Sequence, residues 1–270
     1  MPELPEVETA KRGLEPSLVN QVFDDIFIHQ GNLRWPIQKN IKSLLRHKKI
    51  LSLSRRGKYL LINLENGSLI IHLGMSGSLK FSSKSSIKHK HDHVIFKFCS
   101  DSYLIFNDPR RFGSIHFSKE LNSFWLIKNL GVEPLSDEFN IDYLWKKCNN
   151  SKTSIKQLLM NHKVVVGVGN IYASESLFYA GINPRKVAHK ISKKRLSLLI
   201  TEIRITLSKA IKLGGSSIRD FTNSNGKMGY FQQSLAVYNR ENEPCFKCNT
   251  KIKRVILGQR SSFYCYKCQK

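Results

Sequence analysis

The first residues of the chain, MPELPE, place Pro2 beside Glu3, and Glu6 follows three residues later. Initiator methionine is commonly removed before a small residue such as proline, which would leave a secondary amine at the start of the mature chain. An α-amino group has a pKa of about 8, so a useful fraction is unprotonated at neutral pH. When such an amine attacks an aldehyde-like sugar carbon, the adduct is a cationic iminium that withdraws electrons from neighbouring bonds. Pro2 is therefore a candidate nucleophile, although the same residues also suit an ordinary helix N-terminus.

Four cysteines near the C-terminus have the spacing of a zinc site, with sixteen residues between two CxxC pairs: Cys245, Cys248, Cys265 and Cys268. Since the N-terminus lacks the pattern of a secretory signal, such pairs indicate metal binding rather than disulfides. Four protein ligands leave no open coordination position, so the zinc should be structural. The residues between the pairs predict a basic β-hairpin with Arg260 at its tip, where an arginine can also be an ordinary solvated turn residue.

Two other turns carry residues that suit a nucleic acid. The turn 108–113 (DPRRFG) combines Arg110 with Phe112, which predicts an aromatic wedge in the base stack and an arginine that fills the gap left by an extruded base. A surface turn with a buried phenylalanine is the alternative. The glycine turn 166–169 precedes Asn170 and a helical stretch, so its free N–H groups favour a phosphate, although Asn170 also suits a plain N-cap.

Single basic residues are weaker signals. His91 lies between two other histidines at a strand entry, and we favour a phosphate contact there because no cysteine or carboxylate pattern completes a metal site. Lys58 begins a strand and, taken alone, is ordinary basic surface. The whole chain has 44 basic and 20 acidic residues, a formal net charge of +24, which favours a polyanionic partner such as DNA. With no apolar run of membrane-spanning length, we expect a cytoplasmic protein.

The elements that must position these residues change character along the chain. Residues 7–19 suit a short helix, and seven β-branched or aromatic runs between about 21 and 119 predict an antiparallel sandwich or barrel. Residues 121–130 suit another helix, and 131–137 have the composition of a hinge. Apolar residues then recur at helical spacing up to Ile211. The glycine-rich stretch 214–229 predicts a mobile loop.

Taken together, these stretches resemble the bacterial formamidopyrimidine-DNA glycosylases over essentially the whole chain. The stretches that carry the resemblance occur in the family's order: MPELPEVET, RRGKYLL, IHLGMSGSL, KHDHV, DPRRFG, VVGVGNIYASESLF, GYF and the paired CxxC motifs. The resemblance implies an α+β multidomain fold: an N-terminal antiparallel β-sandwich (1–132), a helix-two-turn-helix domain with a lesion loop (133–230) and a four-cysteine zinc-finger β-hairpin (235–270).

The resemblance also implies roles that the residues alone leave open. Pro2 would attack C1′ of an oxidised purine nucleotide, Glu3 would protonate the sugar ring oxygen, and Glu6 would position both. Lys58 and Arg260 would act as proton donors or phosphate clamps during strand cleavage. The remaining residues implied in DNA binding are Met75, Arg110 and Phe112, which fill the void in the duplex, and His91, Arg110, Lys152 and Asn170, which contact the backbone.

The activity implied is that of a bifunctional DNA glycosylase and AP lyase in base excision repair. It would remove 8-oxoguanine and formamidopyrimidines and then nick the strand by β,δ-elimination, with one structural zinc ion and no nucleotide cofactor. We expect a monomer that acts on damaged double-stranded DNA in the bacterial nucleoid. The alternatives are an endonuclease VIII-like enzyme for oxidised pyrimidines, which Leu4 disfavours because that branch usually has glycine there, and a non-catalytic DNA-binding protein.

The chain departs from the family pattern at three places. Met228 stands where the family commonly has proline, which puts the order of the lesion loop in doubt. Asn239 stands where the family commonly has glycine, and the basic run expected just before Lys152 reads Asn149-Asn150-Ser151, so that phosphate contact would be weaker.

Overall fold

The computed structural model describes residues 2–83, 89–215 and 235–270. The chain divides into two compact units, one of residues Met1–Lys128 and Leu213–Gln232 and the other of Asn129–Lys212 and Gln233–Lys270. The expected lesion loop, Met228 included, lies outside the described residues from 216 on.

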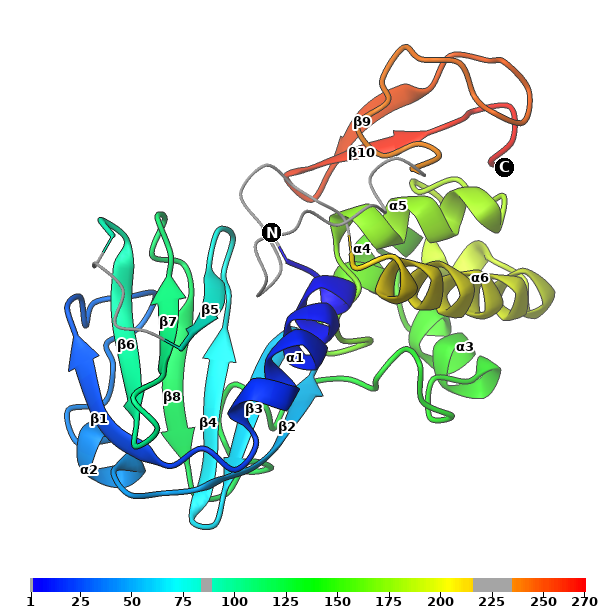
Figure 1. The fold of residues 1–270 in the computed structure, drawn as a ribbon. Coiled ribbons are helices and arrows are strands. Elements are labelled where there is room, and N and C mark those ends of the chain that lie inside the picture. The colour runs from blue at the N-terminus through cyan, green and yellow to red at the C-terminus, as the bar shows by residue number, and fades with distance from the viewer. Residues whose placement is uncertain (1, 84–88, 216–234) are drawn as a thin grey trace. The chain divides into compact units, whose positions relative to one another are not determined.

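The first unit is the predicted antiparallel β-sandwich. Its two four-stranded sheets have the orders β1-β6-β7-β5 and β2-β3-β4-β8 (Figure 1). The strands are β1 (Phe23–Ile28), β2 (Ile50–Arg56), β3 (Tyr59–Leu64), β4 (Gly67–His72), β5 (Ser78–Ser82), β6 (Asp92–Phe98), β7 (Tyr103–Asn107) and β8 (Ser114–Ser118). All seven of the predicted runs form strands, whereas β5 was not anticipated because its sequence, SLKFS, is short and largely polar.

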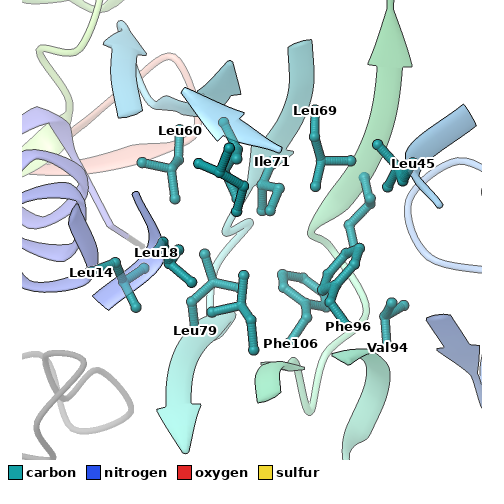
Figure 2. Packing of buried hydrophobic residues seen from close by; sticks show 14 of the residues in the cluster. Leu14, Leu18, Leu45, Leu60, Leu69, Ile71, Leu79, Val94, Phe96 and Phe106 are labelled. Carbon is teal, nitrogen blue, oxygen red and sulfur yellow. The ribbon is translucent and has the colours of Figure 1, made fainter. Parts of the chain in front are cut away.

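The apolar core lies between the two sheets. In β6, Val94, Phe96 and Phe98 are buried while Ile95 and Lys97 are partly exposed, the alternation expected of a strand with one face in the core. Figure 2 shows Leu60, Leu69 and Ile71 of one sheet opposite Phe96 and Phe106 of the other. Helix α1 (Leu4–Leu18) and the short helix α2 (Ile41–Leu45), which was not anticipated, bury leucines in the same cluster.

Helix α1 contacts β2, β3 and β5. It begins three residues before the helix predicted from the sequence, because Glu3 is its N-cap and Pro5 lies in its first turn. A proline is tolerated there, because the backbone N–H that it lacks would have no acceptor within the helix. The helix predicted over 121–130 is wrong: these residues form successive turns. Trp125 instead packs edge-on against Trp35, with ring centroids 5.1 Å apart, so aromatic contacts rather than a helical face hold this segment.

The second unit is helical and ends in a hairpin. Its elements are α3 (Ile141–Asn149), α4 (Ile155–Met160), α5 (Asn170–Tyr179), the 3-10 helix η1 (Ala188–Lys190), α6 (Lys193–Lys212), β9 (Lys253–Leu257) and β10 (Arg260–Tyr264). Leu196, Leu199, Ile203 and Leu207 bury one face of α6, as their helical spacing predicts. Helix α5 contacts α4, α6 and β10, and its residues 171–178 are all buried. It is the centre of this unit.

The part of the chain that the structure describes contains no helix long and apolar enough to cross a membrane.

Candidate active site and zinc module

The start of helix α1 brings Glu3 and Glu6 together. The two residues form a capping box, in which the backbone N–H of Glu3 donates to Oε2 of Glu6 at 2.7 Å and the Glu3 side chain accepts from the backbone of Glu6. Glu3 is 2% exposed and Glu6 is 1% exposed, and Pro2 beside them is also buried. The hydrogen bonds that cap helix α1 therefore hold both carboxylates next to Pro2, the candidate nucleophile.

Lys58 lies in the tight turn between β2 and β3, after Gly57, whose φ of 58° lies in the left-handed region. The next residue, Tyr59, begins β3 and pairs with His72 on the neighbouring strand β4. Burial, together with the positive charges of Lys58 and Arg34, lowers the pKa of His72 to about 3. The imidazole beside Lys58 is therefore neutral, and its Nδ1 accepts a hydrogen bond from the backbone N–H of Gly74 at 3.0 Å.

The candidate wedge residues lie on two loops of the sandwich. Met75 is half-buried in the connection between β4 and β5, and Arg110 and Phe112 are exposed in the connection between β7 and β8. Phe112 is 44% exposed, so it is not the buried turn residue of the alternative interpretation. The guanidinium carbon of Arg110 lies 5.0 Å from the centre of the Phe112 ring. His91 is partly exposed just before β6. Its carbonyl oxygen accepts a hydrogen bond from the backbone N–H of Asp108, the first residue of the loop that carries Arg110.

In the second unit, Asn170 is tied to the C-terminal hairpin. Its Oδ1 accepts a hydrogen bond from Nζ of Lys156 at 2.7 Å, and its Nδ2 donates to the carbonyl oxygen of Ser261 at 3.0 Å. Lys156 is 1% exposed and also donates to Oγ of Ser262 at 2.7 Å. Lys156 was not anticipated from the sequence, because nothing in the sequence of α4 distinguishes a buried lysine from a solvated one.

The hairpin itself forms as predicted. Its turn residues Gly258 and Gln259 have φ values of 52° and 61°, as a two-residue type I′ turn requires. Arg260 begins β10 directly after this turn and is exposed. It immediately precedes Ser261 and Ser262, so the Lys156 contacts fix the backbone that carries it. Lys152 is exposed in the loop between α3 and α4.

The four cysteines of the predicted zinc site come together. Their Sγ atoms all lie within 4.8 Å of one another, and three of the S···S separations are 3.4, 3.5 and 3.9 Å. A tetrahedral ion with Zn–S bonds of about 2.3 Å requires S···S separations of about 3.8 Å, so the donor set fits zinc. With four thiolates as ligands, the ion would serve to fold the hairpin. Cys245 and Cys265 also pack against Phe178 and Val237 in one apolar cluster.

Asn239, one of the departures from the family pattern, has a φ of 61°. This is the left-handed conformation for which glycine is the default and asparagine the best-tolerated replacement. The substitution therefore preserves the local chain direction. The next residue, Arg240, donates to the carbonyl oxygen of Ala236 at 2.7 Å and lies over the Phe246 ring.

Comparison with known proteins agrees with this architecture. Residues 1–115 match the family model of the formamidopyrimidine-DNA glycosylase N-terminal domain, and residues 130–222 match that of its H2TH domain. The formamidopyrimidine-DNA glycosylases of Ruthia magnifica subsp. Calyptogena magnifica and Salmonella arizonae are 49% and 50% identical to this chain, with both sequences covered completely.

Solved structures agree as well. The MutM (Fpg) protein from Thermus thermophilus superposes with a TM-score of 0.89 at 34% identity and covers 99% of this chain and 98% of its own. The wild-type Lactococcus lactis Fpg (MutM), in complex with DNA that contains N7-benzyl-Fapy-dG, superposes with a TM-score of 0.91 at 36% identity, with both chains fully covered. The chain belongs to the formamidopyrimidine-DNA glycosylase family.

Proposed function

We propose that the protein is a bifunctional DNA glycosylase and AP lyase that removes oxidised purines from duplex DNA in base excision repair. The proposal is supported by the relatives named formamidopyrimidine-DNA glycosylase and by Lactococcus lactis Fpg, which has been solved with DNA containing Fapy-dG analogues and abasic sites. The observation that carries it is the buried pair Glu3 and Glu6 beside Pro2, in which the backbone N–H of Glu3 donates to Oε2 of Glu6 at 2.7 Å.

The chemistry follows from the positions of these groups. Once Met1 is removed, the nitrogen of Pro2 forms a bond to C1′ as the bond between C1′ and the base nitrogen breaks, and the proton that the Pro2 nitrogen loses leaves with the base. Glu3 gives a proton to the ring oxygen as the C1′–O4′ bond breaks, and an iminium remains between Pro2 and C1′. Glu6 holds the backbone at Glu3 and so positions the acid.

The iminium also makes strand cleavage accessible. It acidifies the C2′ proton, whose loss expels the 3′ phosphate by β-elimination, and a second elimination releases the 5′ phosphate. Lys58 and Arg260 act in these steps as proton donors or phosphate clamps. Met75, Arg110 and Phe112 fill the space that the extruded nucleotide leaves, while His91, Lys152 and Asn170 contact the backbone. Zinc, held by Cys245, Cys248, Cys265 and Cys268, keeps the hairpin that carries Arg260 folded.

The proposal divides the chain into three domains, 1–132, 133–230 and 235–270. The family models over 1–115 and 130–222 support the first two of them, and the four clustered cysteines support the third. In this proposal the protein is a monomer that works on the chromosome, which in a bacterium places it in the cytoplasm at the nucleoid. Light scattering of the free protein would test the monomer, because a dimer would double its apparent mass.

Borohydride trapping tests the chemistry directly. The reagent reduces the iminium, so incubation with a duplex containing 8-oxoguanine should leave protein covalently attached to DNA. Pro2→Gly should sharply reduce the adduct, because the primary amine of glycine can give a neutral imine where proline gives a cationic iminium. Glu3→Gln should reduce excision of the base by at least about 100-fold, the scale of a lost general acid. Lack of any adduct, with mass spectrometry confirming that Pro2 is the N-terminal residue, would contradict the proposal. Faster excision of thymine glycol than of 8-oxoguanine would favour the oxidised-pyrimidine alternative instead.

A further inference from the structure

Asp108 is a fully buried carboxylate at the start of the loop that carries Arg110 and Phe112. It is 0% exposed, and its Oδ2 accepts a hydrogen bond from the backbone N–H of Gly113 at 2.7 Å. Its Oδ1 accepts from the hydroxyl of Ser76 at 2.7 Å and from the backbone N–H of Arg110 at 3.3 Å. One carboxylate therefore closes the Arg110 loop on itself and also reaches a second loop.

Ser76 supplies the link between the two loops. It follows Met75 in the connection between β4 and β5, and it is 4% exposed. Its O–H group donates to Oδ1 of Asp108, and its oxygen accepts from the backbone N–H of Arg110 at 3.2 Å. The single hydroxyl of Ser76 thus bridges the loop that carries Met75 and the loop that carries Arg110 and Phe112.

Steric contact between the two backbones strengthens this link. Gly74 has a φ of 62°, and a Cβ built there would lie 2.3 Å from the carbonyl carbon of Phe112 and 2.4 Å from the nitrogen of Gly113. A Cβ on Gly113 would lie 2.8 Å from the carbonyl oxygen of His72. Only glycines permit so close an approach. The two loops therefore also meet backbone to backbone next to the Ser76 bridge, where residues 72–74 approach residues 112–113.

We propose that Ser76 and Asp108 are positioning residues that hold Met75, Arg110 and Phe112 as one pre-organised wedge. This inference rests on the proposed function, in which these three residues enter the duplex. A wedge must overcome base stacking, and a loop that has to become ordered during insertion loses part of its binding free energy. The hydrogen bonds of Asp108 lie behind the exposed Arg110 and Phe112 side chains, so the order exists before DNA is bound.

The test separates wedge insertion from chemistry. Ser76→Ala removes the bridge, and Ser114→Ala is the matched control, because Ser114 is a buried serine of the same unit whose hydroxyl has no hydrogen-bond partner among the described residues. Each variant is assayed under single turnover on an 8-oxoguanine duplex and on a single-stranded oligonucleotide with a preformed AP site. We expect Ser76→Ala to be about tenfold slower on the duplex, the scale of one lost hydrogen bond, and unchanged on the single strand. Ser114→Ala should match the wild type on both.

Fluorescence gives a second readout. With 2-aminopurine next to the lesion, stopped-flow traces should show that Ser76→Ala slows the unstacking phase by a similar factor. Asp108→Asn should slow the same phase, and the double variant should be no slower than the slower single variant, because both act through one bridge. Equal losses on duplex and single strand, or no loss on either, would overturn the inference.

The same assays distinguish a failure of the proposed function from a failure of the wedge inference. If the wild-type protein neither excises 8-oxoguanine nor is trapped on the single-stranded AP site, the catalytic proposal is wrong, and the positioning role is refuted with it. If the wild type acts on both substrates and Ser76→Ala does too at full speed, only the wedge inference is refuted.

Discussion

Nε of Arg55 lies 3.1 Å from Oε2 of Glu8, and this ion pair joins helix α1 to strand β2. Both side chains are 12% exposed. Arg55 also donates from Nη1 to the carbonyl oxygen of Gly57 at 3.0 Å. One guanidinium group therefore connects the helix that begins at Glu3 with the turn that presents Lys58.

Arg55→Lys should impair the reaction without unfolding the protein. An ammonium group can pair with Glu8 but cannot reach Gly57 at the same time, because it lacks the planar fork of the guanidinium. We expect kcat on an AP-site duplex to fall about tenfold, the scale of one lost hydrogen bond, with KM changed less than twofold. The matched control is Arg12→Lys, since Arg12 also binds Glu8 at 2.8 Å but is 61% exposed. If both variants behave alike, the Arg55 bridge does not position Lys58.

Acidification should destabilise the first unit through His72. The pKa of His72 is about 3 in the folded state and about 6.5 when unfolded, so the unfolded chain takes up the proton first. The stability that the neutral imidazole contributes is therefore complete above pH 6.5 and falls as the pH drops toward 3. Between pH 7 and 5 the loss should be on the order of 1–2 kcal/mol. The pKa of His116, lowered by burial, adds a loss in the same direction.

Urea unfolding at several pH values would measure this effect. His72→Asn removes the titrating ring but leaves an oxygen that can accept from Gly74, so the pH slope should become shallower. His47→Asn is the control, because His47 is exposed and has a φ of 60°, which asparagine adopts readily. A slope unchanged by His72→Asn would show that another group controls acid unfolding.

The sequence predicted those parts of the fold that depend on local pattern. Strand alternation, the helical spacing in α6 and the paired cysteines all reflect short-range chemistry, and the structure contains each of them. The helix predicted over 121–130 does not form, and Trp125 packs instead against Trp35 and Phe124. Lys156 could not be anticipated, since its partners are 14 and more than 100 positions away in the chain. Long-range polar contacts leave no periodic signal.

Zinc removal should unfold the hairpin selectively. The described part of the second unit has a small apolar cluster around Cys245 and Cys265, and the thiolate site supplies the remaining cross-link. Cys248→Ser should lower the zinc content below one ion per chain. It should also remove the contacts of Lys156 with the hairpin and lower the affinity for DNA at least about tenfold. Cys99→Ser is the control, because Cys99 is exposed and is not one of the four clustered thiols. Zinc content by atomic absorption and amide NMR of β9 and β10 would report the change. A folded hairpin in a zinc-free protein would contradict the structural role.

Glu175 binds the backbone of residues 236–238, the chain segment that precedes the four cysteines of the zinc site. It is 0% exposed, and its carboxylate accepts hydrogen bonds from the backbone N–H groups of Ala236 at 2.7 Å, Val237 at 3.0 Å and Tyr238 at 2.8 Å. Burial raises the pKa of Glu175 above its usual 4.5, and these bonds and Arg240 oppose that rise. Three donors thus converge on one side chain of α5.

Glu175→Gln replaces one accepting oxygen with an amide group that points its own hydrogens at these donors. At least one buried N–H then lacks a partner, which should lower the free energy of unfolding by about 1–3 kcal/mol. Ser176→Ala is the matched control, because Ser176 is equally buried on the same helix and its hydroxyl has no partner among the described residues. Denaturant unfolding followed by far-UV circular dichroism would measure both. A Glu175→Gln protein as stable as Ser176→Ala would mean that the three N–H groups find other acceptors and that the carboxylate does not hold this segment.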